Sequence, residues 1–572
     1  MIYRLSRFIP GLLVRLLVAV GLRGSNDHNY DASDKLLYQY DFIVVGGGTA
    51  GGAVAARLAE VEGWRVLLLE AGGPPPPESV VPGLNVVLMQ SDADWNYFTV
   101  PQKHSLRGYV GRSCHFPTGR ALGGSSTINW MMYVRGNRRD FDKWEAMGNP
   151  GWSFDNVLKY FKKSEDYRGV RRPETAFYRG VGGPASVENK RWGTPLMHAI
   201  LKAGNQLGYD VIDPNGPEQI GFSIPDMTTK NGRRGTSADS YIRPAVIRRP
   251  NLHVVMNAFV TQILFDDRKR AIGVRFEQYG KVRTVMAQRE VVVSAGAVGS
   301  PKLLMLSGVG PEEHLRRHKI PVVVNLPGVG ENFQDHPSIF GLTWTAIEEY
   351  SRHGTGPLSC PLGVEVNAWA MSEEGDPYWP ELQFLFVSGT PAFDYGLFVT
   401  DGIGYTRELF NKYYKSLIGL EGFTVGPMLT RPKSRGTVSH PDDVATLVRG
   451  IKFALTVGNA PALREELGAR FHSQPLPGCE REIPGSDPYW ACYVRHMAKT
   501  TWHPVGSCKM APPSDPLGVV DHTLKVRGVS GLRVVDGSIM PVITSGNTNA
   551  PCYMIGEKGA DLIKEDWGVL PG

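Results

Sequence analysis

Phe42-Ile43-Val44-Val45-Gly46-Gly47-Gly48-Thr49-Ala50-Gly51 is the stretch that decides the fold of this chain. Its four apolar residues have the length and branching of a buried parallel strand. The glycines that follow have G-x-G-x-x-G spacing, and small apolar residues then recur at helical intervals. A second apolar run, Trp64 to Leu69, ends in Glu70. The whole stretch predicts a β-α-β unit that binds a dinucleotide.

Each glycine of this motif has a separate physical task, and so has the acidic residue that ends the second strand. Gly46 allows a tight turn, Gly48 lets the backbone approach a pyrophosphate, and Gly51 permits close packing of helix against strand. The free N–H groups and partial positive charge of the helix N-terminus attract the diphosphate. Glu70 ends the second strand, where a carboxylate accepts hydrogen bonds from ribose hydroxyls and repels a 2'-phosphate. NADP is therefore disfavoured.

Composition limits the class of protein. A chain of 572 residues predicts two or three domains. Lysine and arginine number 62 against 56 acidic residues, and this small excess predicts no nucleic-acid partner. No run of eighteen apolar residues occurs, so no membrane-spanning helix is expected. The six cysteines lack the spacing of a metal site. Cys479 and Cys492 either form one disulfide or are buried thiols.

The N-terminal segment has the composition of a targeting sequence. Its first 24 residues contain four arginines and no acidic residue, around an apolar stretch that Arg15 interrupts. We interpret residues 1–38 as a targeting or tail segment and expect a secreted protein. An arginine-rich, acid-poor start also fits a mitochondrial presequence, and a membrane-associated or cytosolic tail is a third interpretation.

Beyond the first unit, periodicity predicts further elements. Residues 154–163 and 194–207 have helical patterning. Residues 252–255, 262–265 and 272–277 are expected to be strands of an antiparallel excursion. The less regular, aromatic-rich stretch that follows, from about Ser338 to Arg435, is interpreted as a second domain that faces a substrate.

Two glycine-containing blocks carry the next indication of function. The first is Gly119-Arg120-Ala121-Leu122-Gly123-Gly124-Ser125-Ser126-Thr127-Ile128-Asn129, in which paired glycines and hydroxyl groups allow close backbone approach to a ligand. The second runs from Gly296 to Gly310 and predicts a strand exit, a helix and a glycine stop.

With these two blocks the chain resembles the glucose-methanol-choline (GMC) oxidoreductase family, flavoenzymes that oxidise alcohols, and in it the insect glucose dehydrogenase-like branch. The resemblance covers nearly all of residues 39–566. It implies FAD rather than NAD as cofactor, and an α/β fold with two parts. These are an FAD-binding Rossmann-like domain with a parallel sheet and an α+β substrate-binding domain with an antiparallel sheet.

The resemblance also implies domain limits. The FAD-binding region is expected at residues 39–336 and is completed by residues 515–566, approximately. The substrate-binding region is expected at residues 337–514, with the C-terminal region of the family at about 426–566.

Site residues are carried over by position. The resemblance implies cofactor contacts, besides those of the first unit, from Arg120, Gly124, Asn129, Val260, Trp502, Asp536 and Gly537. Some relatives attach the flavin to a histidine at the position where this chain has Ile128, so the FAD is expected to be noncovalent. No metal ligand is implied.

The chemistry is expected at His503 and Asn547. Oxidation of an alcohol removes a proton from oxygen and a hydride from carbon, and the resemblance places flavin N5 as the hydride acceptor. A neutral imidazole, with an ordinary pKa of about 6.5, suits the first task, so His503 is the expected base. Asn547 is expected to hold the substrate oxygen. His336 is expected to pack beneath the flavin.

Electrons are then expected to pass to a quinone-like acceptor. An oxygen-using alcohol oxidase, a hydroxynitrile-lyase-like protein and a flavin-binding pseudoenzyme are the alternatives. Two segments are shorter than in the family, one between Thr345 and Gly354 and one between Val438 and Pro441. Their loss is expected to expose a sheet edge and to impair closure over the flavin.

Overall fold

The computed structural model describes residues 32, 34, 36–345, 363–371, 375–435 and 440–569. Most of the expected targeting segment lies outside these residues, as do 346–362 and 436–439, where the two shortened segments fall. In the described part of the chain no helix combines the length and apolarity needed to cross a membrane.

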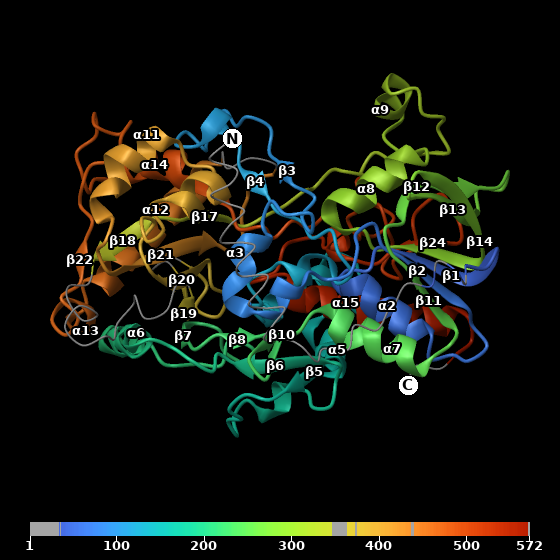
Figure 1. Cartoon of the computed structure of the whole chain (residues 1–572), viewed down its shortest axis with the longest axis horizontal. Helices are drawn as coiled ribbons and strands as arrows, with labels where there is room; N and C mark the ends of the chain where they lie inside the picture. Colours follow the sequence, from blue (N-terminus) through green and yellow to red (C-terminus); the bar gives the residue numbers. More distant parts are fainter. Residues whose placement is uncertain are drawn as a thin grey trace.

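Two lobes, each built on one large sheet, make up the molecule (Figure 1). The sheet of the first lobe has six strands in a continuous order, and a seventh pairs with its fourth member. The order is β11 (Leu252–Val255), β2 (Val66–Leu69), β1 (Gln39–Val45), β14 (Lys281–Val293), β13 (Ala271–Gln278) and β12 (Phe259–Phe265), with β24 (Leu532–Val534) beside β14.

Parallel pairing at the centre of this sheet follows from its apolar strands. β1 runs parallel to both β2 and β14, and residues 40–45 of β1 are buried. Helix α2 (Thr49–Leu58) follows β1 and packs closely against α15 (Asn549–Asp566), where a Cβ at Gly556 would lie 2.7 Å from the carbonyl oxygen of Ala50. The predicted β-α-β unit is confirmed.

One prediction about the strands of this sheet is wrong. β12, β13 and β14 form the expected antiparallel ladder, but β11 pairs in parallel with β2 at the opposite edge. The physical reason is the connection: helix α7 (Arg243–Arg248) precedes β11 and returns the chain to the parallel edge. A short apolar run has the same pattern in either orientation.

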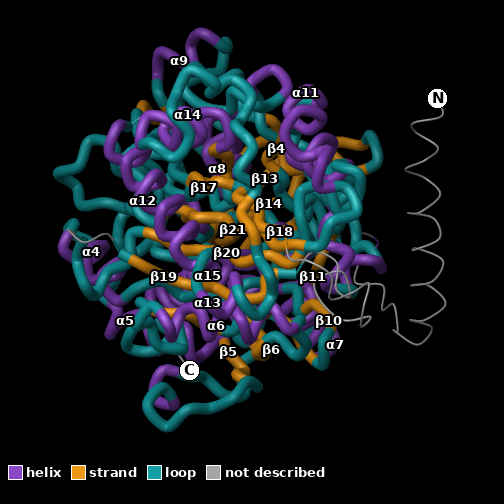
Figure 2. Tube along the Cα trace, turned by 90° about the vertical axis from the view of Figure 1, so that its left-hand side faces the viewer, coloured by secondary structure: helices purple, strands orange, loops and turns teal. Residues whose placement is uncertain are grey.

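The second lobe carries the predicted antiparallel sheet. Its main order is β22 (Arg470–Phe471), β18 (Leu342–Thr345), β21 (Gly422–Leu429), β20 (Leu382–Ser388), β19 (Val364–Ala370) and β7 (Gly221–Ser223), with β17 (Pro337–Ile339) and β23 (Ala498–Thr500) off this path. Helices α12 (Pro441–Gly458) and α6 (Pro195–Gln206) pack against it, and Figure 2 shows helices outside the strands.

The effect of the two shortened segments on a sheet edge stays a prediction, because these segments lie outside the described residues. β22 lies beside β18, and β7 lies beside β19, so each longer outer strand has a short partner. β7 comes from sequence far upstream of the rest of this sheet. Cys479 and Cys492 form a disulfide, which decides between the two alternatives for this pair.

Candidate active site

One elongated cavity runs between the lobes, from the carboxyl ends of β1 and β2 to the C-terminal part of the chain. It brings together most of the predicted cofactor and catalytic residues. Those that line it are Gly46, Gly48, Glu70, Gly124, Asn129, Val260, Trp502, His503, Asp536, Gly537 and Asn547. Ile128 lines it as well.

Two predicted cofactor contacts lie outside the lining. A Cβ at Gly51 would be 2.0 Å from the carbonyl oxygen of Gly46, so Gly51 serves the close packing of helix on strand. Arg120 is exposed, and its guanidinium lies over the ring of Trp95, 5.2 Å from the centroid. Because Trp95 lines the cavity, Arg120 lies one side chain behind its wall.

The two glycine-rich loops meet across the cavity. The N–H of Gly123 donates to the carbonyl of Gly47 at 2.8 Å. Gly124 has a φ of +53°, and a Cβ there would lie 2.7 Å from the Cα of Gly48. Any side chain at this point would fill the space, so the glycines keep open a channel of backbone donors of the kind that binds a diphosphate.

Carboxylates brace both sides of this channel. Glu70 accepts N–H bonds from Gly47 at 2.8 Å and Gly72 at 2.7 Å, and burial raises its pKa to about 6. Asp536 accepts the N–H of Gly296 at 2.8 Å and the hydroxyl of Ser300 at 2.5 Å, which ties the start of α8 (Gly296–Leu306) to the strand β24. Glu70 and Asp536 each stabilise a local turn, and their oxygens still have lone pairs that can accept from a ligand.

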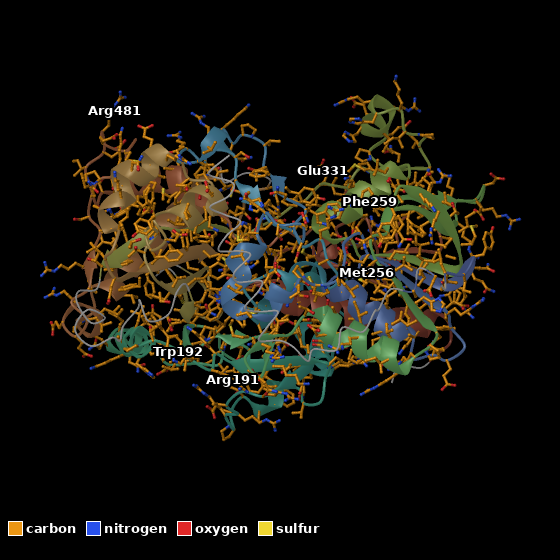
Figure 3. The ribbon with its side chains drawn as sticks, in the orientation of Figure 1. Arg191, Trp192, Met256, Phe259, Glu331 and Arg481 are labelled. Atoms are coloured by element: carbon orange, nitrogen blue, oxygen red, sulfur yellow. A yellow bond between two sulfur atoms is a disulfide. The ribbon has the colours of Figure 1, made fainter. Side chains whose placement is uncertain are left out.

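The cavity contains a buried donor that fits a bound cofactor. The Nδ2 of Asn549 has no hydrogen-bond partner among the described residues, although its Oδ1 accepts the hydroxyl of Thr49 at 2.8 Å. Such a buried amide requires an acceptor. Phe259 and Val260 line the opposite end, and Phe259 lies in the lobe of the first sheet (Figure 3). These residues fit the FAD that the sequence implies.

His503 and Asn547 meet at the far end of the cavity. The Nε2 of His503 lies 3.1 Å from the Nδ2 of Asn547. The preceding residue, Trp502, has a φ of +65°, a conformation that is rare for a bulky residue and typical of functional sites. The carboxylate of Asp335 accepts the backbone N–H of His503 at 2.9 Å, so the strained turn is held in place.

His336 contacts His503. Its Nε2 lies 3.1 Å from the carbonyl oxygen of Thr430, and its Nδ1 lies 3.0 Å from the Nδ1 of His503. This contact joins residues 167 positions apart, which no local pattern reveals, and the packing of His336 beneath the flavin stays a prediction.

This chain of bonds fixes the tautomers. A carbonyl oxygen only accepts, so the Nε2 of His336 carries the proton, and the Nδ1 of this neutral ring is an acceptor. His503 must then donate from Nδ1. Its Nε2 is left with a lone pair that accepts from Asn547, as a base in the cavity requires.

Both rings are held neutral. Burial lowers the pKa of His336 to about 4. Burial, reinforced by His336 and Lys499, holds the pKa of His503 well below its usual range. The arrangement therefore presents an unprotonated nitrogen to an incoming ligand at neutral pH.

Two further residues were missed by sequence reasoning. Gln383, on β20, donates from Nε2 to the Oδ1 of Asn547 at 3.3 Å, which orients the amide. Arg234 is buried and donates to the carbonyl of Asn129 at 2.6 Å, its Oδ1 at 2.9 Å and the carbonyl of Ser126 at 3.2 Å. Burial lowers its pKa to about 9. Neither residue belongs to a motif that could have indicated it.

Comparison with known families matches both halves of the chain. Models of the N-terminal and C-terminal parts of the GMC oxidoreductases match residues 40–338 and 432–556, respectively. The two matches cover most of the lining of the cavity.

Individual proteins are similar over nearly the whole chain. The glucose dehydrogenase [FAD, quinone] of Drosophila melanogaster is 40% identical over 93% of this chain and 88% of its own length. The oxygen-dependent choline dehydrogenase of Brucella canis is 35% identical, over 91% of this chain and 95% of its own.

Solved structures share the fold. Pyridoxine 4-oxidase from Mesorbium loti superposes with a TM-score of 0.75 at 27% identity, covering 91% of this chain and 98% of its own. A formate oxidase variant from Aspergillus oryzae has a TM-score of 0.77 at 26% identity, covering 92% and 98%, respectively.

Proposed function

The chain belongs to the GMC oxidoreductase family, and we propose from this that it oxidises the CH–OH group of an alcohol or sugar. It is an FAD-dependent oxidoreductase. When bound, the flavin supplies the acceptor for the hydride that leaves the substrate carbon. The single observation that carries the proposal is the unprotonated Nε2 of His503 beside Asn547 at the end of the cofactor cavity.

The residues of this chain divide the remaining work. His503 takes the hydroxyl proton at Nε2, and the proton on Nδ1 stays directed at His336. The Asn547 amide, oriented by Gln383, has a second N–H to direct at the substrate oxygen as negative charge develops on it. Because His503 and Asn547 are both buried, water is largely excluded from this contact.

The FAD is proposed to be noncovalent. Ile128 lines the cavity, and its apolar side chain offers no nucleophile to a flavin ring. Release of intact FAD by acid precipitation of the protein checks this, since a covalent adduct would stay with the pellet.

We propose a quinone-like electron acceptor because the Drosophila melanogaster relative is named as a quinone-dependent glucose dehydrogenase. Anaerobic addition of sugars and primary alcohols to the holoenzyme should bleach the flavin spectrum, and His503→Ala should abolish this while FAD content is retained. Failure of every sugar, sterol and aromatic alcohol to bleach the flavin would count against the proposal.

An oxygen-using oxidase is the second candidate. Solved structures that share the fold include pyridoxine 4-oxidase and formate oxidase. Release of hydrogen peroxide in stoichiometry with substrate would favour the oxidase, and turnover with a quinone in air without peroxide would favour the dehydrogenase.

A further inference from the structure

A second cavity, of about 380 Å³, is lined by His336, the residue that contacts His503. It is enclosed by the short hairpin of β3 (Tyr97–Phe98) and β4 (His115–Phe116), by β17 and by β23, which pairs with β17. The labels of β3, β4 and β17 lie in the same region of Figure 1. Its volume falls in the range of about 300–1,000 Å³ that small-molecule sites occupy. Nothing in the reaction at His503 uses this space.

The walls of this cavity are mainly apolar and aromatic. Phe116 and Phe333 face each other with ring centroids 6.1 Å apart, and Leu106 and Ala498 are buried beside them. Phe98 is 58% exposed and lines the same cavity, so it marks an open, apolar mouth. Walls of this kind fit a flat, weakly polar ring and offer a sugar few of the hydrogen bonds that its hydroxyls need.

One buried amine, that of Lys499, lines the cavity. Lys499 is 6% exposed, and its Nζ donates to the carbonyl of Thr500 at 3.0 Å. Among the described residues no second acceptor lies within hydrogen-bond distance of it, and an ammonium has three donors. Burial lowers the pKa of Lys499 to about 8, so the group is protonated at neutral pH and yields a proton readily.

The second cavity is separated from the first by a thin wall. Tyr97, Val298 and Lys499 line both. Lys499 also lies over the ring of Trp502, 4.0 Å from the centroid, next to the catalytic histidine. A ring in the second cavity would therefore be one layer of side chains away from the cofactor cavity, without entering the space that the alcohol needs.

We infer that this second cavity binds the electron acceptor as a benzoquinone-type ring, held between Phe98, Phe116 and Phe333 with a quinone oxygen on Lys499. The inference rests on the proposed dehydrogenase function. Reduction of a quinone to a hydroquinone takes up two electrons and two protons. Reduced FAD would supply both electrons and one proton, the Lys499 ammonium would give the second proton, and solvent would restore that proton to Lys499.

Two variants test the site without touching the residues of the alcohol reaction. Phe98→Ala removes the aromatic mouth, and Ser105→Phe places a ring in the cavity, because Ser105 is a buried part of its lining. Val181→Ala is the matched control, since Val181 is 64% exposed and lines neither cavity. Circular dichroism and FAD content establish that each variant is folded.

The direct readout is calorimetric titration of the oxidised holoenzyme with a short-chain benzoquinone. The inference expects Phe98→Ala to raise the quinone Kd at least fivefold and Ser105→Phe to abolish binding. Val181→Ala should bind like the unmodified enzyme. The rate of anaerobic flavin bleaching by the alcohol should be the same in all four proteins.

Failure of the inference and failure of the proposed function give different results. An unchanged quinone Kd in both variants, or displacement of the quinone by an alcohol, would place the acceptor in the first cavity and overturn the inference. Absence of flavin bleaching in the unmodified enzyme would instead overturn the proposed function, whatever the titration shows.

Discussion

Thr430 determines, through its main-chain oxygen, which nitrogen of His503 is free to act as a base. His336 links Thr430 to His503, because its two ring nitrogens contact these two residues. His336 is thus a positioning residue, which acts by setting the nitrogen of His503 that carries the proton.

The first prediction separates positioning from packing at His336. His336→Ala should slow anaerobic flavin reduction about tenfold to a hundredfold, because the Nδ1 proton of His503 loses its acceptor and the wrong tautomer becomes populated. His336→Asn should recover much of the rate, since its Oδ1 can accept where Nδ1 did, whereas His336→Gln should not. Equal rates in all three variants would contradict this role.

The second prediction concerns pH. Burial, reinforced by His336 and Lys499, depresses the pKa of His503, so its active neutral form is expected to persist as pH falls through 6.5, and rates should decline only in more acidic buffer. Lys499→Met removes one neighbour and should move the acid limb of the reductive half-reaction to higher pH. Lys558→Met is the control, because burial also lowers the pKa of Lys558 to about 8, but it lines neither cavity. An unmoved limb would count against the coupling.

Acid should also destabilise the fold, because it protonates the buried imidazoles of His336 and His503. The folded-state pKa of His336, about 4, is below its value in an unfolded chain, so the unfolded state binds more protons between about pH 4 and pH 6.5. Stability is therefore full above about pH 6.5 and falls as pH drops through this window. The denaturant midpoint of unfolding should be lower at pH 5 than at pH 7.5, and this difference should be smaller in His336→Asn.

At the scale of elements, Arg234 braces the loop that faces the cofactor. Its forked guanidinium bonds carbonyls at Ser126 and Asn129 together with that of Ser79. Arg234→Lys keeps a charge but cannot reach several acceptors at once. We expect it to weaken FAD binding at least tenfold, measured by recovery of flavin fluorescence on dilution. Arg248→Lys, at an exposed helix position, should leave the affinity unchanged.

The disulfide also acts at the scale of elements, because it closes a loop. Cys479 and Cys492, 13 residues apart, close a loop that leads into α14 (Asp487–Met497). Constraint of the unfolded chain by a loop of this size is worth on the order of 3 kcal/mol. Cys479→Ser with Cys492→Ser should lower the thermal midpoint while the rate of flavin reduction is kept. A matching loss of activity at room temperature would show that the loop also shapes the site.

Elements with strong local patterns could be predicted, and contacts across the chain could not. The β-α-β unit and the helix α8 could be predicted because their glycines and apolar periodicity occur in consecutive residues. β11 was placed in the wrong pairing because its pattern is the same at either edge. Gln383 and His336 reach the site from distant segments, so only the folded chain brings them to Asn547 and His503.

At the scale of the whole molecule, the C-terminal residues complete the first lobe. β24 pairs with β14, and Arg533 on β24 forms a buried ion pair with Glu290, with Nε 2.6 Å from Oε2. α15 covers α2. Both lobes and the cavity between them therefore depend on residues more than two hundred positions apart.

A truncation tests this dependence. Deletion of residues 515–572 should prevent accumulation of soluble FAD-binding protein, because β14 loses a neighbour and α2 loses its apolar cover. Deletion of residues 570–572 alone is the control and should leave yield and FAD content unchanged. Soluble, flavin-loaded protein from the longer deletion would show that the first lobe is complete without the C-terminal strand and helix.

The hydrogen bonds that end on Thr430 have a fixed direction, and this gives the resting enzyme a chemical bias. A carbonyl compound entering the site needs a proton from the ring it meets, and the nitrogen facing it has none to give. An alcohol must instead give up a proton, and the unprotonated Nε2 of His503 can accept it. The backbone oxygen of Thr430 thus prepares the resting site to receive an alcohol, and reduction of a carbonyl compound must first place a proton on the Nε2 of His503.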